Sequence, residues 1–97
     1  MRADYDSEAN ALSIDLVDAA RWEGSEGVGE QVNVTFADGK PVNVELLYPN
    51  LGLEKPLQDA AAQFDLDAEA LVAAAQAAIA APDRVVTVDV AVRASAG

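Results

Sequence analysis

The sequence predicts a small α+β protein with a four-stranded antiparallel meander, two helices packed on one face of the sheet and a C-terminal fifth strand. Apolar and polar residues alternate through the first half of the chain, which is typical of strands buried on one face. Two helical segments follow, and a valine-rich segment then alternates again. A chain of 97 residues has room for one modest core. We therefore expect a single domain over 1–97, with a meander core over 1–48 and a helical hairpin plus the last strand over 49–97.

The chain opens with two predicted strands, Arg2–Tyr5 and Ala11–Leu16. The loop between them, residues 6–10, is rich in turn-forming residues. Residues 17–29 then contain glycines among acidic residues and the only tryptophan, Trp22. We expect this segment to be a polar, flexible connection to the next hairpin.

A β-hairpin over Gln31–Leu47 is the central feature. Its register follows from the requirement that the apolar residues of both strands share one face. A two-residue turn would place Val34 opposite Asn43 and mix the two faces. A three-residue loop that ends at Gly39 instead pairs Val34 with Val42, and it gives the glycine the left-handed conformation that such loops need. We therefore predict the second register.

Helices are predicted after the segment Tyr48–Leu53, which ends the sheet because proline lacks a backbone donor. One helix spans Pro56–Phe64. A second helix begins at the N-cap residue Asp67 and ends near Ala81, where a proline stops it. Both have an apolar stripe, so we expect them to cover the apolar face of the sheet.

The last predicted strand spans Arg84–Arg93, with its valines, including Val86 and Val88, on the inward face. A valine-rich strand left as an open edge would promote aggregation. The strand must therefore pair, either inside the monomer or across a dimer interface. On this ground we expect a homodimer.

Two segments carry a resemblance to a known family. Residues 5–12 read YDSEANAL, and residues 38–47 read DGKPVNVELL. They resemble a short bacterial and archaeal family, domain of unknown function 2283, which typically reads YDPEADALYI and then DGRVVGIEIL. Ser7 replaces the usual proline of this family, and Asn10 replaces its usual aspartate. The resemblance covers about the first half of the chain. It implies a small antiparallel β domain and does not point to any particular activity.

The composition excludes several classes of function. The chain has no cysteine and no histidine, so it lacks disulfides, thiolate metal sites and the commonest general base. Its net charge of −11 repels nucleic acids and anionic membranes, and it favours a basic protein or a cation as partner. We therefore expect no nucleic acid and no membrane partner. No apolar run reaches the length of a membrane span, and the N-terminus is too polar for a signal peptide, which predicts a cytoplasmic protein.

Two helical patterns favour structural roles. Asp65, Asp67 and Glu69 are spaced like the start of a calcium loop, but the glycine and the final glutamate of such a loop are missing. Helix capping explains these acids better. The two helices also have helix-turn-helix spacing, but the second one contains no lysine or arginine to contact DNA. We expect a helical hairpin without either function.

The titratable residues do not indicate catalysis. The numerous carboxylates fit solvated turns and strand faces, the serines have no histidine to activate them, and the lysines lie in loops exposed to water. We therefore expect no catalytic residues, no metal-binding residues and no cofactor, and we do not expect an enzyme.

Exposed aromatic and apolar residues form the candidate interface, because Trp22 and Tyr48 lie in connections where an aromatic side chain can anchor a partner. The candidate interface residues are Trp22, Tyr48, Leu51, Leu53, Val86 and Val88. We expect a small, acidic, non-catalytic interaction protein that self-associates and binds a basic protein partner, as an antitoxin or a regulatory subunit does. The alternative is a domain that binds a small molecule or a cation, or a weak enzyme, with a pocket between the helices and the sheet.

Overall fold

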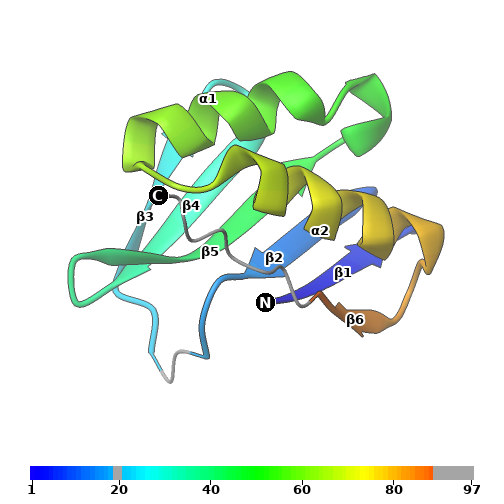
Figure 1. Ribbon diagram of the computed structural model, residues 1–97, viewed down its shortest axis with the longest axis horizontal. Helices are drawn as coiled ribbons and strands as arrows, with labels where there is room; N and C mark the ends of the chain where they lie inside the picture. The colour runs from blue at the N-terminus through cyan, green and yellow to red at the C-terminus, as the bar shows by residue number, and fades with distance from the viewer. Residues whose placement is uncertain (19–20, 89–97) are drawn as a thin grey trace.

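The structure, a computed structural model, describes residues 1–18 and 21–88. It confirms an α+β protein with one antiparallel sheet and two α-helices (Figure 1). The strands are β1 (Arg2–Asp6), β2 (Ala11–Asp15), β3 (Gly24–Val28), β4 (Val32–Ala37), β5 (Lys40–Leu47) and β6 (Val85–Thr87). The helical elements are the 3-10 turn η1 (Pro49–Leu51) and the helices α1 (Glu54–Phe64) and α2 (Ala68–Ala80).

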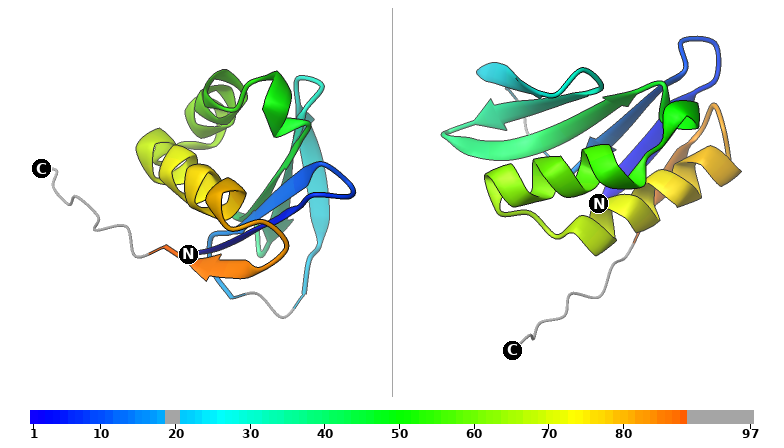
Figure 2. Two further views of the ribbon diagram at one scale, coloured as in Figure 1. Left: turned by 90° about the vertical axis from the view of Figure 1, so that its right-hand side faces the viewer. Right: turned by 90° about the horizontal axis from the view of Figure 1, so that it is seen from above.

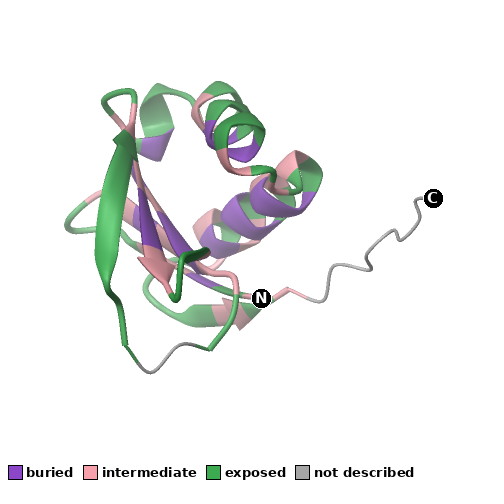
Figure 3. Cartoon of the chain, turned by 90° about the vertical axis from the view of Figure 1, so that its left-hand side faces the viewer, coloured by how far each residue is buried: buried purple, intermediate pink, exposed green. Residues whose placement is uncertain are grey.

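Both helices lie on the same face of the sheet (Figure 2). The hydrophobic core fills the space between the two helices and the sheet. Residues that face one another across four neighbouring strands form the centre of this core; they are Ala3, Ile14, Val44 and Val34. The helices add buried leucines and alanines, and the buried segments of the helices and of the sheet lie on the sides where the two layers face each other (Figure 3). Burying one large aliphatic side chain contributes roughly 1.5–3 kcal/mol. The sheet thus has one apolar face, which the helices cover, and one face that no described helix covers, which we call the open face.

The sheet has six strands, in the order β3-β4-β5-β2-β1-β6, and not four plus one. The prediction that residues 17–29 form a flexible connection is wrong, because β3 lies within them and pairs with β4. Most β3 residues are exposed, so the segment shows no apolar alternation that would predict a strand. Backbone pairing with β4 holds it instead. The tight connection that follows β3 contains Gly29 with a φ of 66°, a conformation that glycine reaches without strain.

The predicted meander also places the wrong strands side by side. A meander of four strands would pair β2 with the next predicted strand, β4, but β2 pairs with β5. After β2 the chain continues at the far edge of the sheet and returns strand by strand. This order brings Leu12 of β2 opposite Leu46 of β5, and both side chains are fully buried. The observed order thus places large apolar side chains next to one another at the centre.

The register predicted for the central hairpin is wrong, although the requirement behind it holds. Val34 faces Val44 and not Val42. The connection is a two-residue turn at residues 38–39, where both φ angles are positive, 54° and 75°. Such a turn matches the twist of the two strands. A two-residue turn alone would mix the faces, so a second feature must restore the alignment.

That feature is a bulge in β5. Thr35 faces Asn43, whereas the next residue, Phe36, faces Pro41, so Val42 is an extra residue on β5. The extra residue shifts the register by one and returns the apolar side chains of both strands to the same face. The bulge also accommodates Pro41, which has no N–H to donate to the neighbouring strand.

The last strand pairs within the monomer, because β6 runs antiparallel to β1. Val86 faces Ala3, and both Val86 and Val88 pack against the core. The predicted strand Arg84–Arg93 is confirmed as a strand over Val85–Thr87, and its residues 89–93 lie outside the described residues. The homodimer stays a prediction.

The helical hairpin is close to its predicted bounds. α1 starts two residues before Pro56, and α2 begins after its N-cap residue Asp67, whose side chain accepts a hydrogen bond from the N–H of Ala70 at 3.1 Å. This bond confirms the capping role that the sequence predicts for Asp67. Neither described helix has both the length and the apolar character that crossing a bilayer requires.

Ser7 links the first hairpin to the turn between α2 and β6. Its N–H donates to Oδ1 of Asp83 at 2.9 Å, and its hydroxyl donates to Oδ2 at 2.7 Å. These two bonds lower the pKa of the Asp83 carboxyl below its ordinary value of 3.8, and the bond from the backbone N–H contributes most. A proline at position 7 could not donate the N–H bond. The departure from the family pattern at this position therefore supports a contact with the second half of the chain.

We predict that Asp83→Asn weakens the acid dependence of stability. Because the folded-state pKa is lowered, the ionised carboxylate stabilises the protein above pH 3.8, and this contribution is lost as the pH falls through the folded-state pKa. The variant should have a lower Tm at neutral pH and a smaller further decrease of Tm between about pH 5 and pH 2. The control is Glu8→Gln, which removes another exposed carboxylate in the hairpin loop that contains Ser7. An identical pH profile for wild type and Asp83→Asn would contradict the assignment.

Candidate functional site

The open face of the sheet carries polar side chains in two rows. Side chains on this face alternate with the core residues along each strand, so neighbouring strands bring them together. From β2 to β3, one row consists of Asp15, Asn43, Thr35 and Ser25, and the other consists of Ser13, Glu45, Asn33 and Gly27. These rows are the floor of a polar surface that no described helix covers.

A hollow of about 350 Å³, which we call the sheet-face pocket, lies over these rows. Its lining residues are Ser13, Trp22, Gly24, Ser25, Asn33, Thr35, Asn43 and Glu45. Trp22 lies two residues before the start of β3 and is 57% exposed. The pocket thus combines amide, hydroxyl and carboxylate groups from the strands with one aromatic side chain from a connection.

Asn43 is the most deeply buried polar residue of this face, with 2% of its surface exposed. Its Nδ2 donates to Oγ of Ser13 at 2.9 Å and to Oδ1 of Asp15 at 2.8 Å. An ionised carboxylate only accepts hydrogen bonds, so the nitrogen of the amide must face Asp15. Both N–H donors are used, and the amide oxygen remains as an acceptor.

Asp4 lies on the open face beyond the pocket, opposite Ser13. Partial burial, and then the negative charges of Asp15 and Asp6, raise the pKa of the Asp4 carboxyl above its ordinary value of 3.8. Among the described residues there is no group of three or more side chains able to hold a metal ion. These acids therefore repel one another without forming a metal centre.

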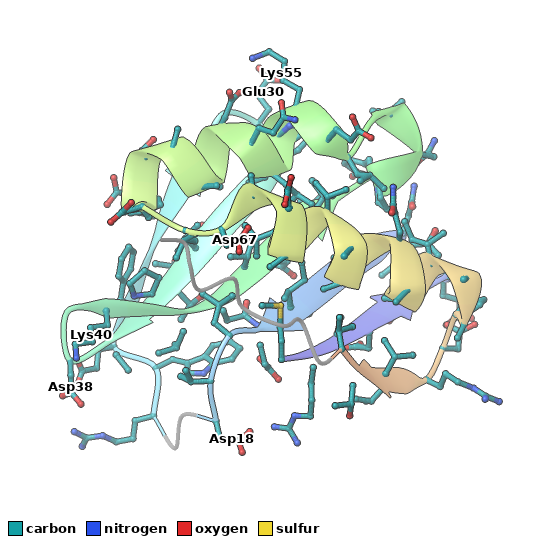
Figure 4. All side chains as sticks on the ribbon, viewed as in Figure 1. Asp18, Glu30, Asp38, Lys40, Lys55 and Asp67 are labelled. Atoms are coloured by element: carbon teal, nitrogen blue, oxygen red, sulfur yellow. The ribbon has the colours of Figure 1, made fainter. Side chains whose placement is uncertain are left out.

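A second hollow, which we call the loop groove, lies on the helix side of the sheet and has a volume of about 790 Å³. It runs between the connection from β3 to β4 and the segment 49–56, which leads through η1 into α1. Its apolar lining includes Leu51 and Leu53, and its charged lining includes Glu30 and Lys55 (Figure 4). The loop groove thus combines apolar and charged walls.

Hydrogen bonds hold the segment that forms one wall of the loop groove. Nε2 of Gln31 donates to the carbonyl oxygens of Leu47 at 3.1 Å and Tyr48 at 3.2 Å. Nδ2 of Asn10 donates to Oδ1 of Asn50 at 2.6 Å. A second departure from the family pattern, asparagine in place of aspartate at position 10, therefore supplies a donor to this segment, because an ionised aspartate has none.

A third hollow, of about 430 Å³, lies at the tip of the hairpin between β4 and β5. Asp18, Asp38 and Lys40 are among its lining residues, and Figure 4 shows Asp38 and Lys40 at this tip. Both signs of charge are present on its walls, so it favours no single class of ligand.

The predicted interface residues fall in three places. Leu51 and Leu53 line the loop groove, and Tyr48, half exposed, directly precedes η1. Trp22 lies on the open face of the sheet, away from these residues. Val86 and Val88 pack against the core beside β1. One predicted group is thus divided between two faces of the sheet and its edge.

Sequence reasoning missed Asn43, Thr35 and Gln31. Their polar side chains at alternating strand positions look like ordinary solvent-facing residues. Thr35 and Asn43 are nevertheless 7% and 2% exposed, because neighbouring strands and the bulge crowd them. An asparagine in the middle of a valine-rich strand was the available signal, since asparagine is rare there unless its amide has a specific partner.

The fold and its surfaces define a small α+β protein with a one-sided antiparallel sheet. Residues 2–48 match the family described as Protein of unknown function (DUF2283). This match to the first half of the chain confirms the resemblance seen in the sequence. The match covers β1 to β5 and ends before η1, so both α-helices and β6 lie outside it. No curated protein and no solved structure matches the chain.

We predict that Asp4→Asn stabilises the protein at neutral pH. Because the folded-state pKa is raised, ionisation of Asp4 costs stability as the pH rises through 3.8 towards the folded-state pKa. The gain should be below about 1 kcal/mol, because solvent screens a partly exposed charge. It should disappear in urea unfolding measured below about pH 2.8, where the wild-type carboxyl is protonated in both states. A variant less stable than wild type at pH 7 would contradict this prediction, and Glu8→Gln is again the control.

Proposed function

We propose that this protein is a non-catalytic interaction module that binds a basic protein partner through the loop groove. The observation that carries the proposal is the position of Leu51, whose surface is 72% exposed on a segment held by hydrogen bonds. Large apolar residues that are exposed on monomeric proteins are usually scattered singly over the surface and do not mark a binding site. Here the exposed leucine lies at the edge of a groove with further apolar lining.

The segment that carries Leu51 is held by hydrogen bonds in the free protein, and this favours binding of a partner. A loop that is already held in one conformation loses little entropy when a partner docks, so more of the contact energy appears as affinity. Gln31 bonds the backbone carbonyl oxygens of Leu47 and Tyr48. The side chain of Asn50 is bonded to the side chain of Asn10. Leu51 can therefore serve as an anchor that a partner covers, and Leu53 extends the same apolar surface into the groove.

The charges around the groove favour a basic partner. Glu30, Glu54 and Asp59 line it, and Lys55 is the cation among its lining residues. Nζ of Lys55 lies 3.2 Å from a carboxylate oxygen of Asp59, which leaves Glu30 and Glu54 to attract a partner. The net charge of −11 over the whole chain adds a long-range attraction of the same sign. An antitoxin-like or regulatory role fits such a surface.

Self-association is the second part of this proposal. β3 and β6 are the terminal strands of the sheet, and in the described part of the chain each pairs on one side only. Unpaired strand edges can pair with a second copy. Light scattering over a dilution series should give twice the monomer mass of 10.1 kDa at high concentration and a decrease on dilution. A monomer mass throughout would exclude this part and leave the loop groove unaffected.

Peptide display tests the groove. We expect a library of displayed 12-residue peptides, selected on the full-length protein, to yield sequences with lysine or arginine near one apolar residue. Leu51→Ser should weaken binding of the selected peptides by about tenfold or more, since burying a leucine contributes about 1.5–3 kcal/mol. The readout is isothermal titration calorimetry at low and moderate salt.

Val17→Ser is the matched control, because Val17 is another exposed aliphatic residue, 55% accessible, and lies outside the groove. It should leave peptide affinity unchanged. Selected peptides that are acidic, or that bind wild type and Leu51→Ser equally well, would refute the proposed site.

A further inference from the structure

We propose that the sheet-face pocket binds a guanidinium group. The pocket lies on the face of the sheet opposite the loop groove, so this inference is independent of the proposed function. It follows from three features of the pocket: an excess of hydrogen-bond acceptors, a buried hydroxyl without a partner, and an aromatic side chain beside an unpaired carboxylate.

The orientation of Asn43 makes its oxygen an acceptor for a ligand. Both N–H donors of the amide are bonded, to Ser13 and Asp15, so its Oδ1 is the group left to face a ligand. Among the described residues this Oδ1 accepts no hydrogen bond, although Asn43 is 2% exposed. A buried polar atom without a partner destabilises the protein, so a donor supplied by a ligand would be favoured.

Thr35 provides the second unpartnered group. It faces Asn43 across β4 and β5, and its residue surface is 7% exposed. Its hydroxyl has no hydrogen-bond partner among the described residues, and it lines the pocket. Neighbouring strands lie about 4.8 Å apart, which places the two groups close enough to meet adjacent N–H groups of one planar ligand.

Glu45 supplies the charge. It lies two residues after Asn43 on the same face of β5 and lines the pocket. No ion pair of Glu45 occurs among the described residues, and the nearby Arg2 pairs with Asp18 at 2.5 Å. The carboxylate therefore lacks a cation and favours a ligand that brings a positive charge.

Trp22 selects among cations. An indole attracts a cation placed over its face. A flat guanidinium can stack on that face while its N–H donors, which lie in the plane of the guanidinium itself, remain free for hydrogen bonds at its edges. A guanidinium has five donors and no acceptor, which is the complement of a pocket that offers Asn43, Thr35 and Glu45 as acceptors. An ammonium has three donors in a compact group and cannot stack in this way, and a phosphate is repelled by the carboxylate.

Fluorescence of Trp22 tests this inference without a label, because it is the only tryptophan in the chain. The probes are N-acetyl-arginine amide, agmatine and, as a neutral isostere, N-acetyl-citrulline amide. We expect both guanidinium compounds to change the emission with saturation, and citrulline to bind at least about tenfold more weakly, because its urea group lacks the charge. N-acetyl-lysine amide should also bind more weakly.

The two guanidinium probes separate the sources of the ligand. Tighter binding of the amide-blocked arginine indicates an arginine side chain of a protein, whereas tighter binding of agmatine indicates a free small molecule. Either result supports the guanidinium site. Equal binding of arginine and citrulline compounds, stronger binding of lysine, or no response of Trp22 would overturn it.

Variants locate the site. Glu45→Gln and Thr35→Val keep the size of the side chain and should each reduce arginine affinity, Glu45→Gln by about tenfold. Glu8→Gln removes the same charge in the loop between β1 and β2, outside the pocket, and controls for the net charge of the protein. Circular dichroism confirms that each variant is folded. Equal losses for Glu45→Gln and Glu8→Gln would show non-specific attraction and refute the site.

Discussion

The structure depends on one constraint, that every large apolar side chain of the central strands points to the same face of the sheet. Val42 satisfies this constraint as an extra residue, because a tight turn without it would move the valines of one strand to the opposite face. With the faces aligned, Val34, Val44 and Ile14 form a continuous buried row. The core, the position of the helices and the polarity of the open face all follow from this alignment.

The two halves of the chain have complementary roles. The half that matches the DUF2283 family model supplies five strands and a one-sided apolar face, which needs a cover. The second half supplies that cover as α1 and α2 and then adds β6 beside β1. Ser7 and Asn10, the two departures from the family pattern, both donate hydrogen bonds to residues of the second half. The departures thus coincide with the contacts between the halves.

A one-sided sheet also explains why two separate surfaces are candidates for binding. The helix side carries a groove only at its end, where Leu51 projects beyond the core, while the layer between helices and sheet is filled. The open face carries amides, hydroxyls and carboxylates, and Trp22 lies beside them. An apolar anchor and an acceptor-rich pocket are suited to different ligands, and both fit an acidic protein that attracts cationic groups.

The sequence by itself determined the α+β class, both helices, the cap at Asp67 and five of the strands, because each depends on local periodicity or on a local hydrogen bond. Only the tertiary structure decided that β3 is a strand, since exposed glycine-rich residues pair there through backbone alone. The same is true of the bulge at Val42 and of the pocket around Asn43, because strand order and register decide which distant side chains meet. Local patterns specify elements, whereas the contacts between elements create the sites.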